Sequence, residues 1–578
     1  MNIQPQTDSV DNDNIFTRRL LLLLLFIFIL GVVIITRLFI LQISQHNFYS
    51  LMSSEKHEVY KNIFPERGSI YTRENDELYP LVTNRNYYLI YADPRKIESP
   101  KKIVDSITSI LGLEEEEWKS LLGRLADKTD PYEPIKHKIT KSQMEKIQDL
   151  NLKGINFLPE IYRYYPEVGI GGHIFGFVST QDDKKIGQYG LEGYFNKELS
   201  GKSGLIKSIK DALGSLVTIG PRSIDKAQDG VDLVLTIDRH VQFTACQKLK
   251  EFYEWFDADS ATVIIMEPTG AILAMCSFPD FDPEKYNEIE DINYLNNPAI
   301  FYPYEPGSIF KAITMAIGLD TGKVEPDTTY IDEGEVKVGP YTIKNSDFKA
   351  HGKQTMTEVL EKSLNTGALY VEQEVGKNVF KRYVESFGFG EPTEITLDTE
   401  MAGDLSQLDK RGDIYGITAS YGQGITVTPL QMVTSFATIV NQGKLPKPYI
   451  VSETISPDGT IQEIKAENVR QVIQPKSASL LSGMLVSVVE NGYGGKAKVD
   501  GYYLGGKTGT AQVAAVGGYG TKTIHSFVGF GPVSNPKFVM LVKLDNPKGV
   551  KFASDSVTPL FGQLSEFLLN YYQIPPDY

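Results

Sequence analysis

The chain has 578 residues, of which 41% are hydrophobic and 23% charged, a composition typical of a globular protein of about two to four domains. The net charge of −15 argues against a nucleic-acid partner, because such binding needs cations that neutralise phosphates. The seven histidines form no metal-binding pattern, and the two cysteines, Cys246 and Cys276, are too few for a disulfide framework. We therefore expect no metal, and we favour buried free thiols over a bond between the two cysteines, which the sequence leaves possible but does not support.

The first element is an uncharged apolar run from Leu20 to Thr36. A helix of this length spans about 25 Å, close to the shortest that crosses a bilayer. Soluble helices are seldom apolar on every face, and no small-x-small cleavage site follows, so a retained anchor over residues 20–43 is favoured over a buried helix or a cleaved signal peptide. Two arginines precede the run and one follows closely, which predicts a cytoplasmic tail of residues 1–19 and a single-pass protein of the cell (inner) membrane.

Residues 44–230 mix helix-like and strand-like segments. Residues 87–93 are strand-like, and residues 100–127 form an amphipathic helical stretch in which Glu114–Glu117 is a solvated face or turn. Thr140 is a candidate N-cap for a further helix. A glycine-rich passage, residues 169–204, separates this region, an elongated mixed α/β domain, from the remainder of the chain.

The pattern changes from residue 231 onward. A short strand precedes a helix that starts near Asp238, and two apolar strands meet at a Pro268–Gly270 turn. Helices and loops occupy residues 304–490, followed by three strands and a final helix over residues 557–572. Two leading and three trailing strands predict one central antiparallel sheet covered by helices, an α+β domain over residues 231–578.

The helix of this region that bears on chemistry starts after Pro306–Gly307 and is expected to run to Gly322. Ser308 and Lys311 share a face of its first turn. A serine nucleophile needs a base, and a lysine serves if burial or a neighbouring cation keeps it neutral. The pair alone does not distinguish a nucleophile from an ordinary helix serine, because the Ser-x-x-Lys spacing recurs at Ser53, Ser99, Ser223, Ser346 and Ser534.

Two further motifs change this interpretation. Ser363 and Asn365 form a Ser-x-Asn motif. The third motif lies on a predicted strand and comprises Lys507, Thr508, Gly509 and Thr510. Alternation along the strand directs Lys507 and Gly509 to one face and the two threonines to the other. The ordered trio S-x-x-K, S-x-N and K-T-G is the signature of penicillin-binding proteins and serine β-lactamases.

A competing motif overlaps the third one. Residues 501–508 match the phosphate-loop pattern G-x-x-x-x-G-K-[ST]. A phosphate loop opens into a helix whose N-terminus binds the anion, whereas here glycine and β-branched threonine follow the lysine. The nucleotide-binding interpretation is therefore disfavoured.

The chain resembles the class B penicillin-binding proteins, the monofunctional peptidoglycan DD-transpeptidases, over nearly its whole length. The segment at residues 72–75, T-R-E-N, departs from the family's D-R-N-G. The resemblance implies a non-catalytic dimerisation-type pedestal over residues 44–230, with a buried pair between Arg67 and Glu192. It extends beyond the active site to pedestal residues Arg67, Gly68, Ile70, Arg73, Arg163, Tyr165, Pro166, His173, Gly176, Gly187, Gly190, Glu192, Leu199, Gly201 and Gly204.

The resemblance also implies a mechanism that needs no cofactor. Ser308 attacks the penultimate D-alanine carbonyl of a stem peptide while Lys311 takes its proton. Ser363 relays a proton to the leaving amine, and Asn365 holds Lys311 and the substrate amide. Backbone N–H groups of residues 308 and 510 form the oxyanion hole. The terminal carboxylate is expected to lie against Lys507, Thr508, Gly509 and Thr510.

Residues 386–405 are more similar to septal, division-type enzymes than to the elongation type. The expected partners are stem peptides, β-lactam inhibitors, a membrane glycan polymerase that supplies the glycan, and division-complex proteins. Two alternatives share the fold: a serine β-lactamase or DD-carboxypeptidase, and a non-enzymatic division scaffold or antibiotic sensor. The anchor and the large pedestal argue against the hydrolases, and the complete motifs argue against the scaffold.

Overall fold

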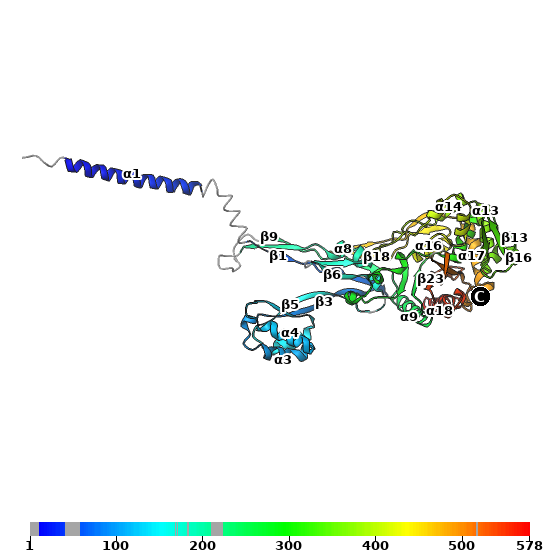
Figure 1. The fold of residues 1–578 in the computed structure, drawn as a ribbon, viewed down its shortest axis with the longest axis horizontal. Coiled ribbons are helices and arrows are strands. Elements are labelled where there is room, and N and C mark those ends of the chain that lie inside the picture. Colours follow the sequence, from blue (N-terminus) through cyan, green and yellow to red (C-terminus); the bar gives the residue numbers. More distant parts are fainter. Residues whose placement is uncertain are drawn as a thin grey trace, which may run out of the picture. The chain divides into compact units, whose positions relative to one another are not determined.

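The structure is a computed structural model that describes residues 11–40, 58–167, 169, 171–181, 184–209, 223–515 and 518–578. Its ribbon is shown in Figure 1. Contacts within the chain define two compact units. One consists of Met1–Pro65 with Lys202–Gln228, and the other of Glu66–Gly201 with Asp229–Tyr578.

The first unit contains the N-terminal helix α1, Asp11–Phe39. Its segment Leu20–Phe39 has a mean hydropathy of 2.9 and is long and apolar enough to cross a membrane, as an anchor or a signal sequence. Residues 41–43 of the predicted span lie outside the described residues. The same unit holds an antiparallel sheet in the order β1-β8-β9, formed by Glu58–Ile63, Gly204–Ile209 and Ser223–Asp225.

The second unit opens with a seven-stranded sheet whose strands come from distant parts of the sequence. Its order is β19-β18-β10-β2-β3-β4, and β5 pairs with the second half of the long strand β3. Because β2 pairs in parallel with β10, the boundary predicted at residue 230 falls between two neighbouring strands of one sheet. The strands are β2 (Ile70–Glu74), β3 (Glu77–Ala92), β4 (Glu133–Ile139), β5 (Ile155–Tyr164), β10 (Asp232–Leu235), β18 (Val451–Ile455) and β19 (Ile461–Glu463).

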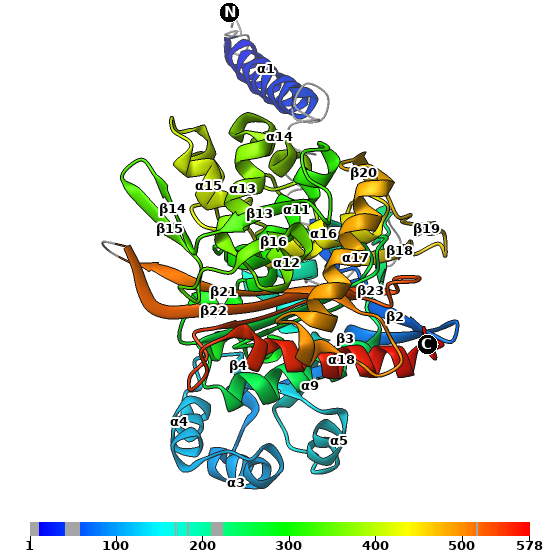
Figure 2. The same cartoon turned by 90° about the vertical axis from the view of Figure 1, so that its right-hand side faces the viewer.

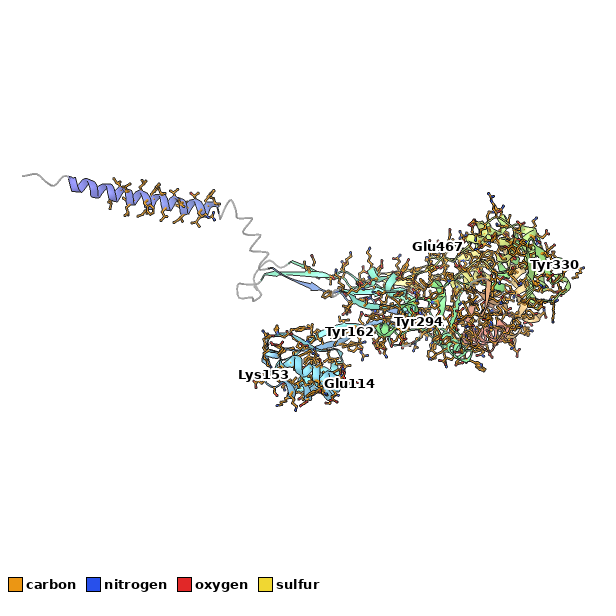
Figure 3. All side chains as sticks on the ribbon, in the orientation of Figure 1. Glu114, Lys153, Tyr162, Tyr294, Tyr330 and Glu467 are labelled. Carbon is orange, nitrogen blue, oxygen red and sulfur yellow. A yellow bond between two sulfur atoms is a disulfide. The ribbon has the colours of Figure 1, made fainter. Side chains whose placement is uncertain are left out.

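Three helices pack together beside β3 and β4 (Figure 2). The predicted helical stretch 100–127 forms two helices, α3 (Pro100–Leu111) and α4 (Glu115–Ala126). Gly112 adopts a left-handed φ of 62° that ends α3, and Glu114 caps α4, so the acidic run is the turn and first turn of a new helix. Figure 3 labels Glu114 and Lys153 in this region. The helix expected after Thr140 is α5, Lys141–Asp149, with Thr140 as its N-cap.

The buried pair expected in the pedestal is confirmed and is extended to a triad. Glu192 lies in the short helix α7, Gly190–Tyr194, and is fully buried. One carboxylate oxygen accepts from Arg67 Nε at 2.6 Å, and the other accepts from Arg163 Nε at 2.6 Å. The surrounding elements are α6 (Gly172–Phe175), β6 (Phe177–Gln181), β7 (Lys184–Gln188) and α8 (Asn196–Ser200).

The predicted central antiparallel sheet is present, in the order β12-β11-β23-β22-β21. Both faces of β11 are buried, since Val263 and Ile265 pack with one hydrophobic cluster while Ile264 and Met266 pack with the other. Figure 2 shows α9 and α18 along one side of the sheet and α11, α16 and α17 on the other. The strands are β11 (Ser260–Met266), β12 (Ile272–Phe278), β21 (Gly505–Ala515), β22 (Gly518–Gly531) and β23 (Phe538–Asp545).

Helices and short ribbons complete this unit. The ribbons pair β13 (Thr329–Asp332) with β16 (Gly352–Thr355), β14 (Glu335–Val338) with β15 (Tyr341–Lys344), and β17 (Lys444–Pro446) with β20 (Asn468–Gln471). The helices are α9 (Arg239–Trp255), α10 (Pro298–Phe301), α11 (Lys311–Asp320), α12 (Met356–Glu361), α13 (Asn365–Val375), α14 (Lys377–Ser386), α15 (Ile414–Ser420), α16 (Pro429–Val440), α17 (Pro475–Asn491) and α18 (Val557–Tyr571).

The expectation of two free thiols is wrong. Cys246 on α9 and Cys276 on β12 form a disulfide, with their Cα atoms 5.5 Å apart. Their separation of 30 residues gives no indication of this. The two meet because α9 packs against β12, a tertiary contact that composition and spacing do not reveal.

Candidate active site

The segment that carries Ser308 is a tight turn followed by a helix. Gly307–Phe310 forms the 3₁₀ turn η5, and α11 continues from Lys311 to Asp320. Gly307 has a φ of 58°, and its N–H donates to Gly422 O at 2.9 Å. Within the described part of the chain the Ser308 hydroxyl has no hydrogen-bond partner, and its side chain is half-buried. Ser308 therefore stands at the start of a helix with its hydroxyl free.

Strand β21 runs beside this turn. A Cβ on Gly307 would lie 2.9 Å from Ala511 Cβ, and a Cβ on Gly509 would lie 3.0 Å from Ile309 Cγ2. Glycine at these two positions permits the close approach of turn and strand. The predicted strand over the third motif is confirmed, and residues 505–508 enter a strand rather than a helix, which removes the phosphate-loop interpretation.

The three motifs meet at one side-chain oxygen. Lys311 Nζ donates to Ser363 Oγ at 3.3 Å and to the Ser363 carbonyl at 2.5 Å. Lys507 Nζ donates to the same Ser363 Oγ at 3.0 Å. Both lysines are essentially buried, Lys311 with 1% exposure and Lys507 with none. Residues separated by 52 and 144 positions from Ser363 thus share one hydrogen-bonded cluster.

Burial determines the charge of the two amines. Desolvation, reinforced by the nearby Lys507 charge, lowers the pKa of Lys311 well below its usual value. Desolvation lowers the pKa of Lys507 to about 7. Lys507 also donates to the Thr508 carbonyl at 3.0 Å and to Thr508 Oγ1 at 3.4 Å, so its three acceptors match an ammonium. Lys311 has two acceptors, both on Ser363, which matches a neutral amine with a free lone pair.

The Ser-x-Asn motif joins two helices. Ser363 lies between α12 and α13 with a φ of 55°, a left-handed conformation that is costly for a residue with a side chain. Asn365 is the first residue of α13, and its amide donates to the Lys344 carbonyl at 2.8 Å. Among the described residues, Lys311 and Asn365 form no hydrogen bond with each other, and the Asn365 side chain is instead bonded to Lys344, the last residue of β15. The structure therefore brings Lys311, Ser363 and Lys507 together and places Asn365 at the edge of the cluster.

The remaining residues of the third motif line β21. Thr508 is 7% exposed and contacts Lys507 through its carbonyl and hydroxyl. Thr510 is half-buried, and its hydroxyl accepts from Ala553 N at 3.0 Å. Gly509 lies over Ile309, next to Ser308.

Sequence reasoning did not assign a role to the segment at residues 422–424. The Gly422 carbonyl holds the Gly307 N–H, and a Cβ on Gly422 would lie 2.1 Å from Gly307 O. The N–H of Gly424 donates to Glu305 Oε1 at 2.9 Å. Two close glycines in the motif S-Y-G-Q-G are a signal of a tight backbone approach, but only the folded chain shows that they approach the turn that carries Ser308.

This geometry is that of a transpeptidase-type domain, and comparison with known proteins agrees. A family model described as the penicillin-binding protein dimerisation domain matches residues 62–235. A second, the penicillin binding protein transpeptidase domain, matches residues 261–566. The chain belongs to the penicillin-binding protein family, and the order of the two domains is that of class B.

The chain is similar to several curated proteins. It is 32% identical over 506 residues to stage V sporulation protein D of Bacillus subtilis, covering 87% of this chain and 77% of that protein. It is 30% identical over 598 residues to a peptidoglycan D,D-transpeptidase FtsI homolog of Mesostigma viride, covering 97% of each.

Solved structures share the fold. Penicillin binding protein 2X from Streptococcus thermophilus matches with a TM-score of 0.75 and 24% identity, over 89% of this chain and 80% of that one. Penicillin binding protein 3 from Mycobacterium tuberculosis matches with a TM-score of 0.67 and 24% identity, over 90% and 98% of the two chains.

Proposed function

We propose that this transpeptidase cross-links peptidoglycan stem peptides through an acyl-enzyme on Ser308. The observation that carries the proposal is the buried cluster in which the side-chain amines of Lys311 and Lys507 both donate to Ser363 Oγ. Lys311 lies one helical turn after Ser308. A lysine kept neutral by burial accepts a proton, and a free hydroxyl at a helix start is available for attack.

The first half-reaction forms an ester. Lys311 takes the proton of Ser308 Oγ, which bonds to the carbonyl carbon of the penultimate D-alanine. The tetrahedral oxyanion is held by backbone N–H groups of residues 308 and 510. The peptide bond then breaks, and the leaving D-alanine amine takes a proton through Ser363. The substrate amide lies against Asn365, and the terminal carboxylate is bound by Lys507, Thr508, Gly509 and Thr510.

The second half-reaction transfers the acyl group. An amine of a neighbouring stem peptide attacks the ester carbonyl, the ester bond breaks, and the proton returns to Ser308. Water in place of the amine would make the protein a hydrolase. β-Lactams acylate the same serine, a proposal supported by the structures of Mycobacterium tuberculosis penicillin binding protein 3 complexed with aztreonam and ampicillin.

We infer that residues 1–19 face the cytoplasm, residues 20–43 anchor the chain, residues 44–230 form the pedestal, and residues 231–578 form the catalytic domain outside the membrane. The apolar helix, its flanking arginines and the two family matches support this division. We infer a septal role beside a membrane glycan polymerase and division-complex proteins, supported by the similarity to the FtsI homolog.

A fluorescent penicillin tests the proposal on the full chain in detergent. We expect wild-type protein to be labelled and Ser308→Ala to lose all labelling without a change in melting temperature. Ser534→Ala is the matched control, because Ser534 has the same spacing to a lysine and is exposed. If Ser308→Ala were labelled as strongly as wild-type protein, Ser308 would be excluded as the nucleophile. A label that persists for many minutes supports the transpeptidase, and rapid release supports the hydrolase.

A further inference from the structure

A buried polar pair outside the three motifs holds the start of α13. Asn345 follows β15 and is 2% exposed. Its Oδ1 accepts the backbone N–H of Asn365 at 3.0 Å and that of Thr366 at 3.3 Å. The first N–H groups of a helix have no partner within the helix, and the N-cap residue Leu364 has no polar side chain to supply one. Asn345 therefore caps α13 from 20 positions away in the sequence.

Asp332 determines the orientation of Asn345. It ends β13, is 1% exposed, and accepts the Asn345 side-chain amide on both carboxylate oxygens, at 3.0 and 2.9 Å. Because the amide NH₂ faces a carboxylate, the amide oxygen must face the helix. Asp332 also accepts the Thr366 hydroxyl at 2.8 Å, which itself contacts the Tyr330 hydroxyl at 3.1 Å. Tyr330 is labelled in Figure 3.

The capped turn adjoins the strained residue of the site. Ser363, with its left-handed φ of 55°, is two positions before the capped N–H of Asn365. Between these two residues, the N–H of Leu364 donates to the carbonyl of Val359 in α12 at 2.9 Å. A non-glycine residue keeps such a conformation only when its surroundings impose it, at a cost of about 1–3 kcal/mol. Without the cap, the first turn of α13 is free to relax and to carry Ser363 Oγ away from the two lysines.

We propose that Asp332 and Asn345 are positioning residues for acylation: they hold Ser363 Oγ between Lys311 and Lys507 by capping α13 from outside the helix. The inference rests on the proposed function and extends it to two residues that touch no reacting atom. A misplacement of about 1 Å in such a site costs about 100-fold in rate.

The test measures the second-order rate of acylation by a fluorescent penicillin, resolved into binding and acylation steps, on the full chain. We expect Asn345→Ala to slow the acylation step about 100-fold with little change in binding. Asp238→Ala is the matched control, because Asp238 also accepts two backbone N–H groups at a helix start, at 3.0 and 3.1 Å on α9. It should lower the melting temperature while changing the rate less than about twofold, because α9 packs in the cluster that does not contain the turn of Ser308.

A charge swap separates positioning from general stability. Asn345→Asp preserves volume but sets two carboxylates in contact, and we expect it to slow acylation about 100-fold. The double variant Asp332→Asn with Asn345→Asp again sets a donor against a carboxylate. Because Asp332 also accepts the backbone N–H groups of Gly334 and His351, at 3.0 and 3.1 Å, the recovery should be partial, about tenfold of the loss.

The inference is overturned if Asn345→Ala or Asn345→Asp acylates at the wild-type rate, if the swap recovers nothing, or if Asp238→Ala is equally slow. A failure of the proposed function would give a different experimental result. In that case wild-type protein would not be labelled by the fluorescent penicillin, or Ser308→Ala would be labelled as strongly as wild-type protein.

Discussion

Replacing Lys507 with methionine should move the pH dependence of acylation to higher pH. The proposed mechanism requires a neutral Lys311, so it predicts a rate that falls as the pH drops through the pKa of that amine. The positive charge of Lys507 helps to keep this pKa low. Removing the charge raises the pKa of Lys311, and a higher pH is then needed to free its lone pair.

The size of the shift follows from the geometry. Both amines bond to Ser363 Oγ, at 3.3 and 3.0 Å, so the nitrogens are at most about 6 Å apart. Two unit charges at that separation interact by about 3 kcal/mol at an effective dielectric constant of about 20. This corresponds to about 2 pH units. The pKa of Lys507 is about 7, so the effect applies where the pH is low enough to keep that lysine charged.

The assay is the acylation rate of a fluorescent penicillin measured from about pH 5 to about pH 10. The readout is the midpoint of the acid limb and not its height, because the carboxylate-binding role proposed for Lys507 predicts that Lys507→Met also weakens substrate binding. Lys522→Met is the control, since Lys522 lies on β22 of the same sheet but is exposed and paired with Asp259. An unchanged midpoint in Lys507→Met, or one shifted to lower pH, would refute the coupling.

Three further changes test the fold around the site. Glu192→Gln should destabilise the protein by about 3–5 kcal/mol in denaturant unfolding, because two buried guanidinium groups lose their counter-charge; a loss below 1 kcal/mol would contradict a structural triad. Cys246→Ser should lower the free energy of unfolding by about 3–4 kcal/mol under oxidising conditions, since the bond to Cys276 closes a loop of 30 residues. Adding reductant should not destabilise this variant any further. Gly307→Ala should slow penicillin labelling at least about tenfold, because the new Cβ lies 2.9 Å from Ala511 Cβ in a left-handed turn; wild-type labelling would show that the turn adapts.

Features that depend on nearby residues were predictable from the sequence. Thr140 and Asp238 cap their helices through the first backbone N–H groups, an interaction that spans two or three residues. The five strands of the central sheet are apolar or punctuated by glycine and proline turns, which signals strands without tertiary information. The structure departs from the predicted elements where a turn residue interrupts a periodic pattern. Gly112 is the example, because it splits one expected helix into α3 and α4.

Contacts between distant residues were not predictable in the same way. The Cys246–Cys276 bond, the pairing of β2 with β10, and the cap that Asn345 places on α13 each join segments whose sequences carry no mark of the partner. Asn365 has the expected residue type, but its amide bonds to the carbonyl of Lys344 at the end of β15. The direction of a side chain depends on what packs around it, and that is set by the whole fold.

The sequence by itself determined which chemical groups are present: a serine followed by a lysine on a helix, a second serine, and a lysine on a strand, in an order that indicates the family. Only the tertiary structure decided that Lys311 and Lys507 meet at one oxygen of Ser363 with water excluded. The physical reason is that packing removes solvent from both amines, which lowers their pKa values, and sets the charge of Lys507 beside Lys311, which lowers the pKa of Lys311 further. Both conditions arise from segments that are far apart along the chain.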